Sequence, residues 1–156
     1  MATLTADEFT TAADHLIKYC CGYNDLAREP IELQLIPAYK SYMSTAKTYL
    51  QLNNTFDIVY CPIYQVPVLY SRQSAHASLN RLQKDIVSFT EHPITGISCV
   101  FFHPCMTATI MKELLLEEIE LNSLQYLITW LGVHNRLADL CIPLEFFANK
   151  DLIIHH

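Results

Sequence analysis

The fold is decided by residues 56–70, which read Phe56-Asp57-Ile58-Val59-Tyr60-Cys61-Pro62-Ile63-Tyr64-Gln65-Val66-Pro67-Val68-Leu69-Tyr70. Two runs of β-branched and aromatic residues flank Pro62, and such runs are typical of strands. Similar runs occupy residues 31–36 and 39–52, and Asn53-Asn54 then supplies a strong tight-turn signal. We therefore expect an antiparallel meander between residues 31 and 71, with Pro62 and Pro67 at irregular or edge positions because proline donates no ladder hydrogen bond.

A helix is predicted on the N-terminal side of this meander. Thr5 and Glu8 have the spacing of a capping box, which begins a helix. Apolar residues then recur at steps of three and four residues: Phe9, Ala13, Leu16 and Cys20. Gly22 is the residue that we expect to end this helix.

Further elements are predicted on the C-terminal side. Residues 72–91 suggest a loop and a short helix, because Leu82, Ile86 and Phe89 recur at helical spacing. Residues 97–102 are apolar on both faces and predict a buried strand that ends at His103-Pro104. Helices are expected over residues 108–118 and 121–137, and an extended segment over 142–147. The chain is therefore expected to have an α+β fold.

The size and composition indicate one globular domain over residues 1–156. Hydrophobic residues make up 51% of the chain and charged residues 17%, which excludes a disordered polymer. The net charge of -6, without a basic patch, argues against nucleic-acid binding. The longest apolar stretches are too short or too interrupted to span a bilayer.

The N-terminal residues 1–8 lack the basic flank and apolar stretch of a secretory signal. The chain has six cysteines, and without export we expect free thiols in a reducing compartment such as the cytosol. Cys20 and Cys99 lie at apolar positions and are predicted to be buried. No paired metal-ligand spacing occurs, so we expect no metal site and no cofactor.

His103-Pro104-Cys105 is the sequence that most strongly suggests chemistry. It places a thiol just after a buried strand, with an imidazole two residues away that can favour the thiolate. The local pattern alone still favours a partly buried cysteine over a nucleophile. A cysteine hydrolase would need a histidine brought to Cys105 by the fold, and the sequence does not choose among the candidates His15, His76, His92 and His134.

Taken in order, four segments resemble the autophagy-related ubiquitin-like-conjugating enzyme 10 family. They are Tyr64-Gln65-Val66-Pro67 within residues 59–70, then Glu91-His92-Pro93-Ile94-Thr95-Gly96, then Phe102-His103-Pro104-Cys105-Met106-Thr107, and finally Tyr126-Leu127-Ile128-Thr129-Trp130-Leu131 running on to Ile142-Pro143-Leu144. The sister enzyme of the lipid branch shares His-Pro-Cys but carries large insertions for which this chain has no room.

The resemblance implies a fold like that of ubiquitin-conjugating enzymes, with an N-terminal helix, an antiparallel sheet, a catalytic cysteine segment and C-terminal helices. It implies that Cys105 accepts autophagy-related ubiquitin-like protein 12 as a thioester from its activating enzyme, autophagy-related protein 7. The acyl group then passes to a lysine of autophagy protein 5, in the cytoplasm or at the preautophagosomal structure. This chain would consume no ATP itself.

The sequence contains no obvious residue that would stabilise the oxyanion formed in this reaction. Ordinary ubiquitin-conjugating enzymes use an Asn before the cysteine, whereas residues 97–99 occupy that approximate region here and include no Asn. We expect His103 or Tyr64 to support the reaction, and a structural role for each stays open. Two other functions also stay open: a non-catalytic binding module of the same fold, and a cysteine hydrolase.

Overall fold

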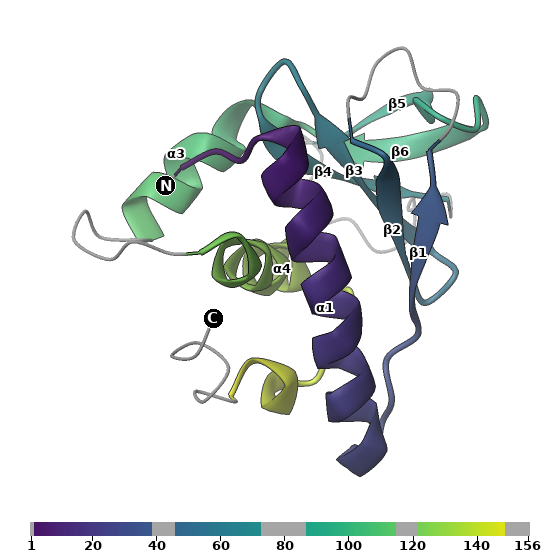
Figure 1. Ribbon diagram of the computed structural model, residues 1–156. Helices are drawn as coiled ribbons and strands as arrows, with labels where there is room; N and C mark the ends of the chain where they lie inside the picture. The colour runs from purple at the N-terminus through teal and green to yellow at the C-terminus, as the bar shows by residue number, and fades with distance from the viewer. Residues whose placement is uncertain (1, 39–45, 73–86, 115–121, 149–156) are drawn as a thin grey trace.

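The computed structural model describes residues 2–38, 46–72, 87–114 and 122–148. Its elements, in chain order, are α1 (Ala6–Leu26), β1 (Leu33–Pro37), β2 (Thr48–Leu52), β3 (Phe56–Cys61), β4 (Val66–Ser71), β5 (Val87–Glu91), β6 (Ser98–Phe102), the 3-10 turn η2 (Pro104–Met106), α3 (Thr107–Leu114), α4 (Ser123–Ala138) and the 3-10 turn η3 (Leu144–Phe147). The strands form one antiparallel sheet in the order β1-β2-β3-β4-β6-β5. The predicted α+β fold, with a helix before the sheet and helices after it, is confirmed (Figure 1).

The helix α1 begins as the sequence predicts and ends later than predicted. The Thr5 hydroxyl accepts from the Glu8 amide, and the Glu8 carboxylate accepts from the Thr5 amide. This reciprocal pair satisfies two donors that a helix start leaves open. The prediction that Gly22 ends the helix is wrong, because α1 continues to Leu26. Glycine at that position is accommodated with a helical backbone.

The meander β1–β4 is confirmed, and its turn signals have the expected geometry. Asn53 and Asn54 both have positive φ, at 51° and 55°, which is the conformation of a tight hairpin turn. Pro67 lies inside β4, opposite Tyr60 of β3. The other neighbour, β6, pairs only with Tyr70 and Ser71, so Pro67 interrupts no bond to that strand.

Two predictions for the C-terminal half are wrong. Residues 87–91 form β5 rather than helix, because alternation along an edge strand outweighs the helical spacing that Phe89 completes. Leu82 and Ile86 of the same prediction lie outside the described residues. The extended segment expected over 142–147 is mostly η3, whose turn buries Phe146 with its ring edge-on to Tyr19 of α1 at 4.9 Å.

The main core lies between the sheet and the helix pair α1 and α4, which pack against each other on one side of the sheet (Figure 1). Leu50, Ile58 and Leu69 project from β2, β3 and β4 into it, and Trp130 of α4 is wholly buried there. The opposite face carries a smaller apolar cluster around Tyr49 and Val59. None of the described helices combines the length and apolar character needed to cross a membrane.

Candidate active site

Cys105 is held at an exposed position by two buried neighbours. Phe102 ends β6 in the core, and Pro104 is buried at the first position of η2. After these anchors the chain turns outward, and both Cys105 and Met106 are exposed, the latter by 52%. The partly buried cysteine favoured by the local sequence pattern is therefore wrong. A thiol at this position meets the access requirement of a nucleophile.

His103 lies on the same segment and is oriented by the neighbouring strand. Its Nε2 lies 2.7 Å from the Ser88 hydroxyl of β5, and its ring stands edge-on to Phe101 with centroids 4.7 Å apart. The described residues contain no hydrogen bond between His103 and Cys105. The imidazole is thus two residues from the thiol in the sequence, and its orientation is set by its contact with Ser88 of β5.

Tyr64 is exposed at the tip of the β3–β4 hairpin. The tip is anchored because Gln65 donates to the Cys61 carbonyl at 2.8 Å and accepts from the Leu4 amide at 2.7 Å. The turn η2, which carries Cys105, packs against β4. Since β6 runs antiparallel to β4 and leads into η2, Tyr64 and Cys105 lie toward the same end of the sheet.

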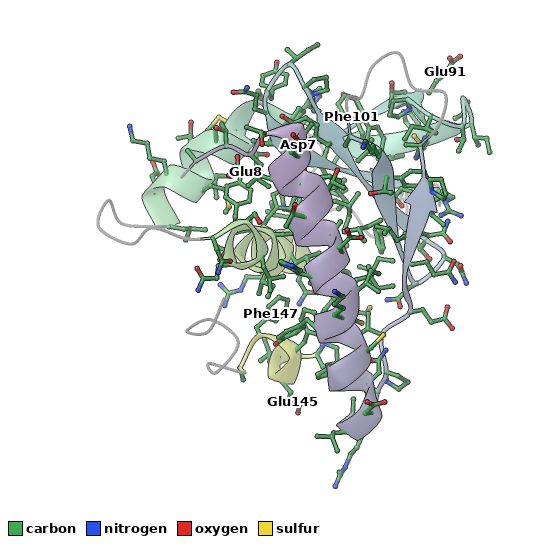
Figure 2. All side chains as sticks on the ribbon, viewed as in Figure 1. Asp7, Glu8, Glu91, Phe101, Glu145 and Phe147 are labelled. Atoms are coloured by element: carbon green, nitrogen blue, oxygen red, sulfur yellow. The ribbon has the colours of Figure 1, made fainter. Side chains whose placement is uncertain are left out.

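Residues 97–99, which include no Asn, lie at the other end of β6 from Cys105. Ser98 and Phe102 bound this strand, and four steps of about 3.3 Å separate them by about 13 Å. Figure 2 shows Glu91, which pairs with Ser98, and Phe101 toward opposite ends of the β5–β6 pair. An oxyanion donor must therefore come from the Cys105 end of the strand.

A buried charge cluster, formed by Asp57, Arg72 and His92, was not found by sequence analysis. Asp57 is only 1% exposed, and its two oxygens lie 2.6 Å from Arg72 Nη2 and 2.9 Å from His92 Nε2. Burial raises the pKa of Asp57, but the hydrogen bonds from His92 and Arg72 and the positive charge of Arg72 outweigh it, so this pKa lies below its usual value. The only signal in the sequence is one aspartate inside an apolar strand.

His92 is committed to this cluster. Its Nδ1 accepts from the amides of Ile94 and Thr95, both at 3.1 Å, and its Nε2 faces Asp57. With both nitrogens engaged, His92 has no free lone pair for a thiol. This geometry removes it as the base of a cysteine hydrolase.

The other histidines that the structure describes do not complete a cysteine–histidine pair either. His134 is buried against Trp130, with ring centroids 3.9 Å apart, and His15 lies on α1. Burial lowers the pKa of His134 to about 4, against the opposing effect of its bond to the Trp130 carbonyl. His76 is outside the described residues. Within the described ranges no histidine is hydrogen-bonded to Cys105, so nothing there favours a hydrolase.

All six cysteines are free thiols, and they fall into different environments. Cys20 and Cys99 are buried, as predicted, and burial raises the pKa of Cys20 to about 11. A thiol with such a pKa is a poor nucleophile at neutral pH. Among the residues that the structure describes, no three His, Cys, Asp or Glu side chains group as metal ligands.

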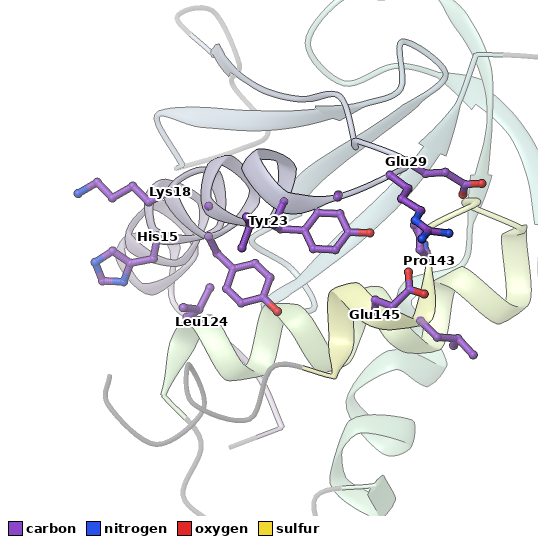
Figure 3. A pocket seen from close by; sticks show the side chains of 13 residues that line it. His15, Lys18, Tyr23, Glu29, Leu124, Pro143 and Glu145 are labelled. Carbon is purple, nitrogen blue, oxygen red and sulfur yellow. The ribbon is translucent and has the colours of Figure 1, made fainter.

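A large cavity of about 1040 Å³ lies away from the Cys105 segment. It lies between the second half of α1 and the approach to η3, where Tyr23, Pro143 and Glu145 line it (Figure 3). Basic and acidic side chains both line it, including Lys18 and Glu29. Its walls include no cysteine, so it does not support chemistry at a thiol.

Residues 33–145, which include Cys105, match the family described as "Autophagocytosis associated protein, active-site domain". The chain is also similar to two proteins named "Ubiquitin-like-conjugating enzyme ATG10". The one from Dictyostelium discoideum is 30% identical over 126 residues, covering 62% of this chain and 55% of that protein. The one from Homo sapiens is 27% identical over 124 residues, covering 67% of this chain and 56% of that protein. The chain spans about half the length of these relatives, and the matches confirm the resemblance seen in the sequence.

Proposed function

The chain belongs to the family of autophagocytosis-associated active-site domains, and from this premise we propose that it is a ubiquitin-like-protein conjugating enzyme with Cys105 as its acyl carrier. The observation that carries the proposal is the exposed thiol on the turn η2, directly after the buried anchors Phe102 and Pro104. An acyl carrier must be reached by two macromolecules in turn, and it must be held on rigid elements. Cys105 meets both requirements.

The proposed reaction has two acyl-transfer steps. The Cys105 thiol gives up its proton and attacks the glycyl thioester on the activating enzyme, whose cysteine leaves as thiolate. An acceptor lysine amine then attacks the new thioester, an isopeptide bond forms, the Cys105 thiolate leaves, and the amine proton passes to base. Each tetrahedral intermediate carries an oxyanion that donors must stabilise.

We propose His103 and Tyr64 as the supporting residues at this site. The His103 ring is held by Ser88 beside the segment, and the Tyr64 hydroxyl is exposed on an anchored hairpin tip at the same end of the sheet. Removing one oxyanion donor typically slows acyl transfer by about a hundredfold. Tyr64→Phe should show such a loss without a change in folding if its hydroxyl is the donor.

The partners in this proposal are those of the autophagy conjugation pathway. Autophagy-related protein 7 loads the chain, autophagy-related ubiquitin-like protein 12 is carried, and autophagy protein 5 accepts. The names of the two curated relatives support a ubiquitin-like conjugation reaction. We further propose that the reaction occurs in the cytoplasm and at the preautophagosomal structure, without ATP consumption by this chain.

The acceptor is proposed to bind along an edge of the sheet. β1 and β5 are the edges of the described sheet, and unpaired backbone groups at an edge offer strand addition. β5 neighbours β6, the strand that leads to Cys105, and it carries Phe89 with 67% of its surface exposed. An acceptor strand on β5 would therefore lie one strand away from the chain that positions the thiol.

A non-catalytic binding module of the same fold is the second candidate, and one gel separates the two. The full chain is incubated with the activating enzyme, ATP and the ubiquitin-like protein, and resolved without reductant. We expect an adduct that thiols cleave, that Cys105→Ala loses, and that the exposed-cysteine control Cys21→Ala retains. Cys105→Ser should give an oxygen ester that resists thiols. A folded wild-type chain that forms no adduct would establish the module instead.

A further inference from the structure

A small cavity lies directly behind the Cys105 segment. Its volume is about 40 Å³, and it is enclosed by the end of β6, by η2 with α3, and by α4. His103 and Met106, on either side of Cys105, both line it. The remaining wall is mostly apolar, with Phe102 and Val133 among its residues. Whatever occupies this cavity therefore contacts the turn that presents the thiol.

Two polar side chains interrupt the apolar wall, and each is more than nine-tenths buried. Thr107, the first residue of α3, is 6% exposed, and His134 of α4 is 7% exposed. His134 Nδ1 lies 2.9 Å from the Trp130 carbonyl, which can only accept, so Nδ1 carries the proton. Nε2 is then a lone-pair acceptor, and within the described residues neither it nor the Thr107 hydroxyl has a hydrogen-bond partner.

The volume of the cavity and the polar groups in its wall are suited to a water molecule. A cavity of this volume holds a water molecule, whereas an apolar ligand such as benzene needs about 150 Å³. Water also needs at least two polar partners, and Thr107 and His134 supply them. Burial lowers the pKa of His134 to about 4, so the neutral ring offers its lone pair under ordinary conditions.

We propose that one water molecule in this cavity bridges the Thr107 hydroxyl to His134 Nε2, and that the bridge positions the Cys105 turn. The water donates to Nε2 and shares a second hydrogen bond with the threonine. α3 begins at Thr107, two residues after the thiol, whereas α4 is fixed in the core by Trp130. The bridge thus ties the helix that follows the thiol to the most buried helix of the fold, and Thr107 and His134 are positioning residues.

The positioning role rests on the proposed function, whereas the bridge itself can be tested without it. In the full chain with ¹⁵N-labelled histidine, the Nε2 resonance of His134 reports whether its lone pair accepts a hydrogen bond. Thr107→Val keeps the side-chain shape and removes the hydroxyl, so we expect this resonance to move to the position of a free lone pair. Thr107→Ser should keep the wild-type position, and Thr109→Val, an exposed control on the same helix, should also leave it unchanged.

The same variants test the positioning role through transfer from preloaded Cys105. We expect Thr107→Val to slow single-turnover transfer by about three- to tenfold, as the loss of one hydrogen bond predicts, with the acceptor concentration for half-saturation unchanged. Thr107→Ser should restore the rate. If the Nε2 chemical shift of His134 is the same in Thr107→Val as in wild type, the water bridge is refuted. If the chemical shift changes but the transfer rate stays at the wild-type value, the positioning role is refuted. Failure of Cys105 to form any adduct would instead refute the proposed function. The Nε2 chemical shift of His134 would still test whether the water bridge exists.

Discussion

The two ends of β6 differ in what surrounds them. Beyond Phe102 the chain turns outward, and the Cys105 thiol is exposed and forms no hydrogen bond with the described residues. Before Ser98, the connection from β5 is tied down by His92, which contacts Asp57 and two backbone amides. The strand β6, whose two ends are about 13 Å apart, therefore leads to an accessible thiol at one end and to the connection that carries His92 at the other.

This difference indicates that the two ends of β6 have different roles: one end exposes the thiol to partners, and the other end contributes to the stability of the fold. A buried charge that loses its partner is costly, so Asp57, Arg72 and His92 must stay together in the folded chain. An exposed thiol forms few contacts, so its replacement costs little stability. Substitutions at the His92 end are expected to change folding, and substitutions at the Cys105 end to change chemistry.

The largest expected effect on folding comes from Asp57→Asn. The change leaves the Arg72 guanidinium and the His92 ring without their anion, and breaking a buried pair typically costs about 3 kcal/mol. We expect a loss near this lower bound, because the Arg72 side chain is a third exposed and recovers some hydration. Urea unfolding followed by circular dichroism measures the loss.

The control for this variant is Asp25→Asn, which neutralises an exposed carboxylate on α1. Its free energy of unfolding should lie within about 0.5 kcal/mol of wild type. Equal losses in the two variants would show that the charge cluster contributes no more than an exposed charge, and the comparison between the ends of β6 would fail.

Acid should weaken the same cluster by protonating Asp57. Because its folded pKa is below the unfolded value of about 3.9, the stabilisation is present above that pH and disappears as the pH falls through the folded pKa. The stability difference between wild type and Asp57→Asn should hold from pH 7 to about pH 4 and shrink below it. His134, whose pKa is lowered to about 4, destabilises both proteins as the pH falls from 6.5 and cancels in the difference. A difference that persists unchanged in strong acid would contradict the assignment.

Gly96→Ala tests the backbone of the turn that carries His92. Gly96 has φ of +73° and donates its amide to the His92 carbonyl at 2.9 Å, while the space around a new Cβ is open. The cost is therefore backbone strain alone, about 1 kcal/mol. Gly22→Ala in α1 also meets open space but has helical geometry, so it should stabilise by about 0.5–1 kcal/mol. The two substitutions should shift the urea midpoint in opposite directions.

The sequence predicted those elements of the fold whose local signals agree with their packing. The capping box at Thr5 and the Asn53-Asn54 turn act within a few residues, so the structure has them where expected. The strand β5 was predicted as a helix because an edge strand buries few side chains and so has a weak apolar alternation. Phe89 also falls at the three-residue spacing that is typical of a helix. The turn η3 was missed because Phe146 is drawn in by Tyr19, which is 127 residues away.

The candidate site divides in the same way. The motif around Cys105 can be recognised from adjacent residues, and its position after a strand follows from the apolar run before it. The exposure of the thiol depends on how Phe102 and Pro104 pack, and the approach of the Tyr64 hairpin depends on sheet register. The contact between Asp57 and His92 joins residues 35 positions apart, and a single sequence contains no local signal for it.

The smallest expected effect on folding, and the largest on chemistry, comes from Cys105→Ala. The thiol is exposed, so the free energy of unfolding should change by less than about 0.5 kcal/mol, while the thiol-linked adduct disappears. Cys99→Ala is the matched control on β6, because that thiol is buried and its loss should cost about 1 kcal/mol while the adduct still forms. Urea unfolding and the non-reducing gel, run on both variants, should therefore give opposite results. If Cys105→Ala were the more destabilised protein, Cys105 would be a structural residue, and the separation of access from stability along β6 would be refuted.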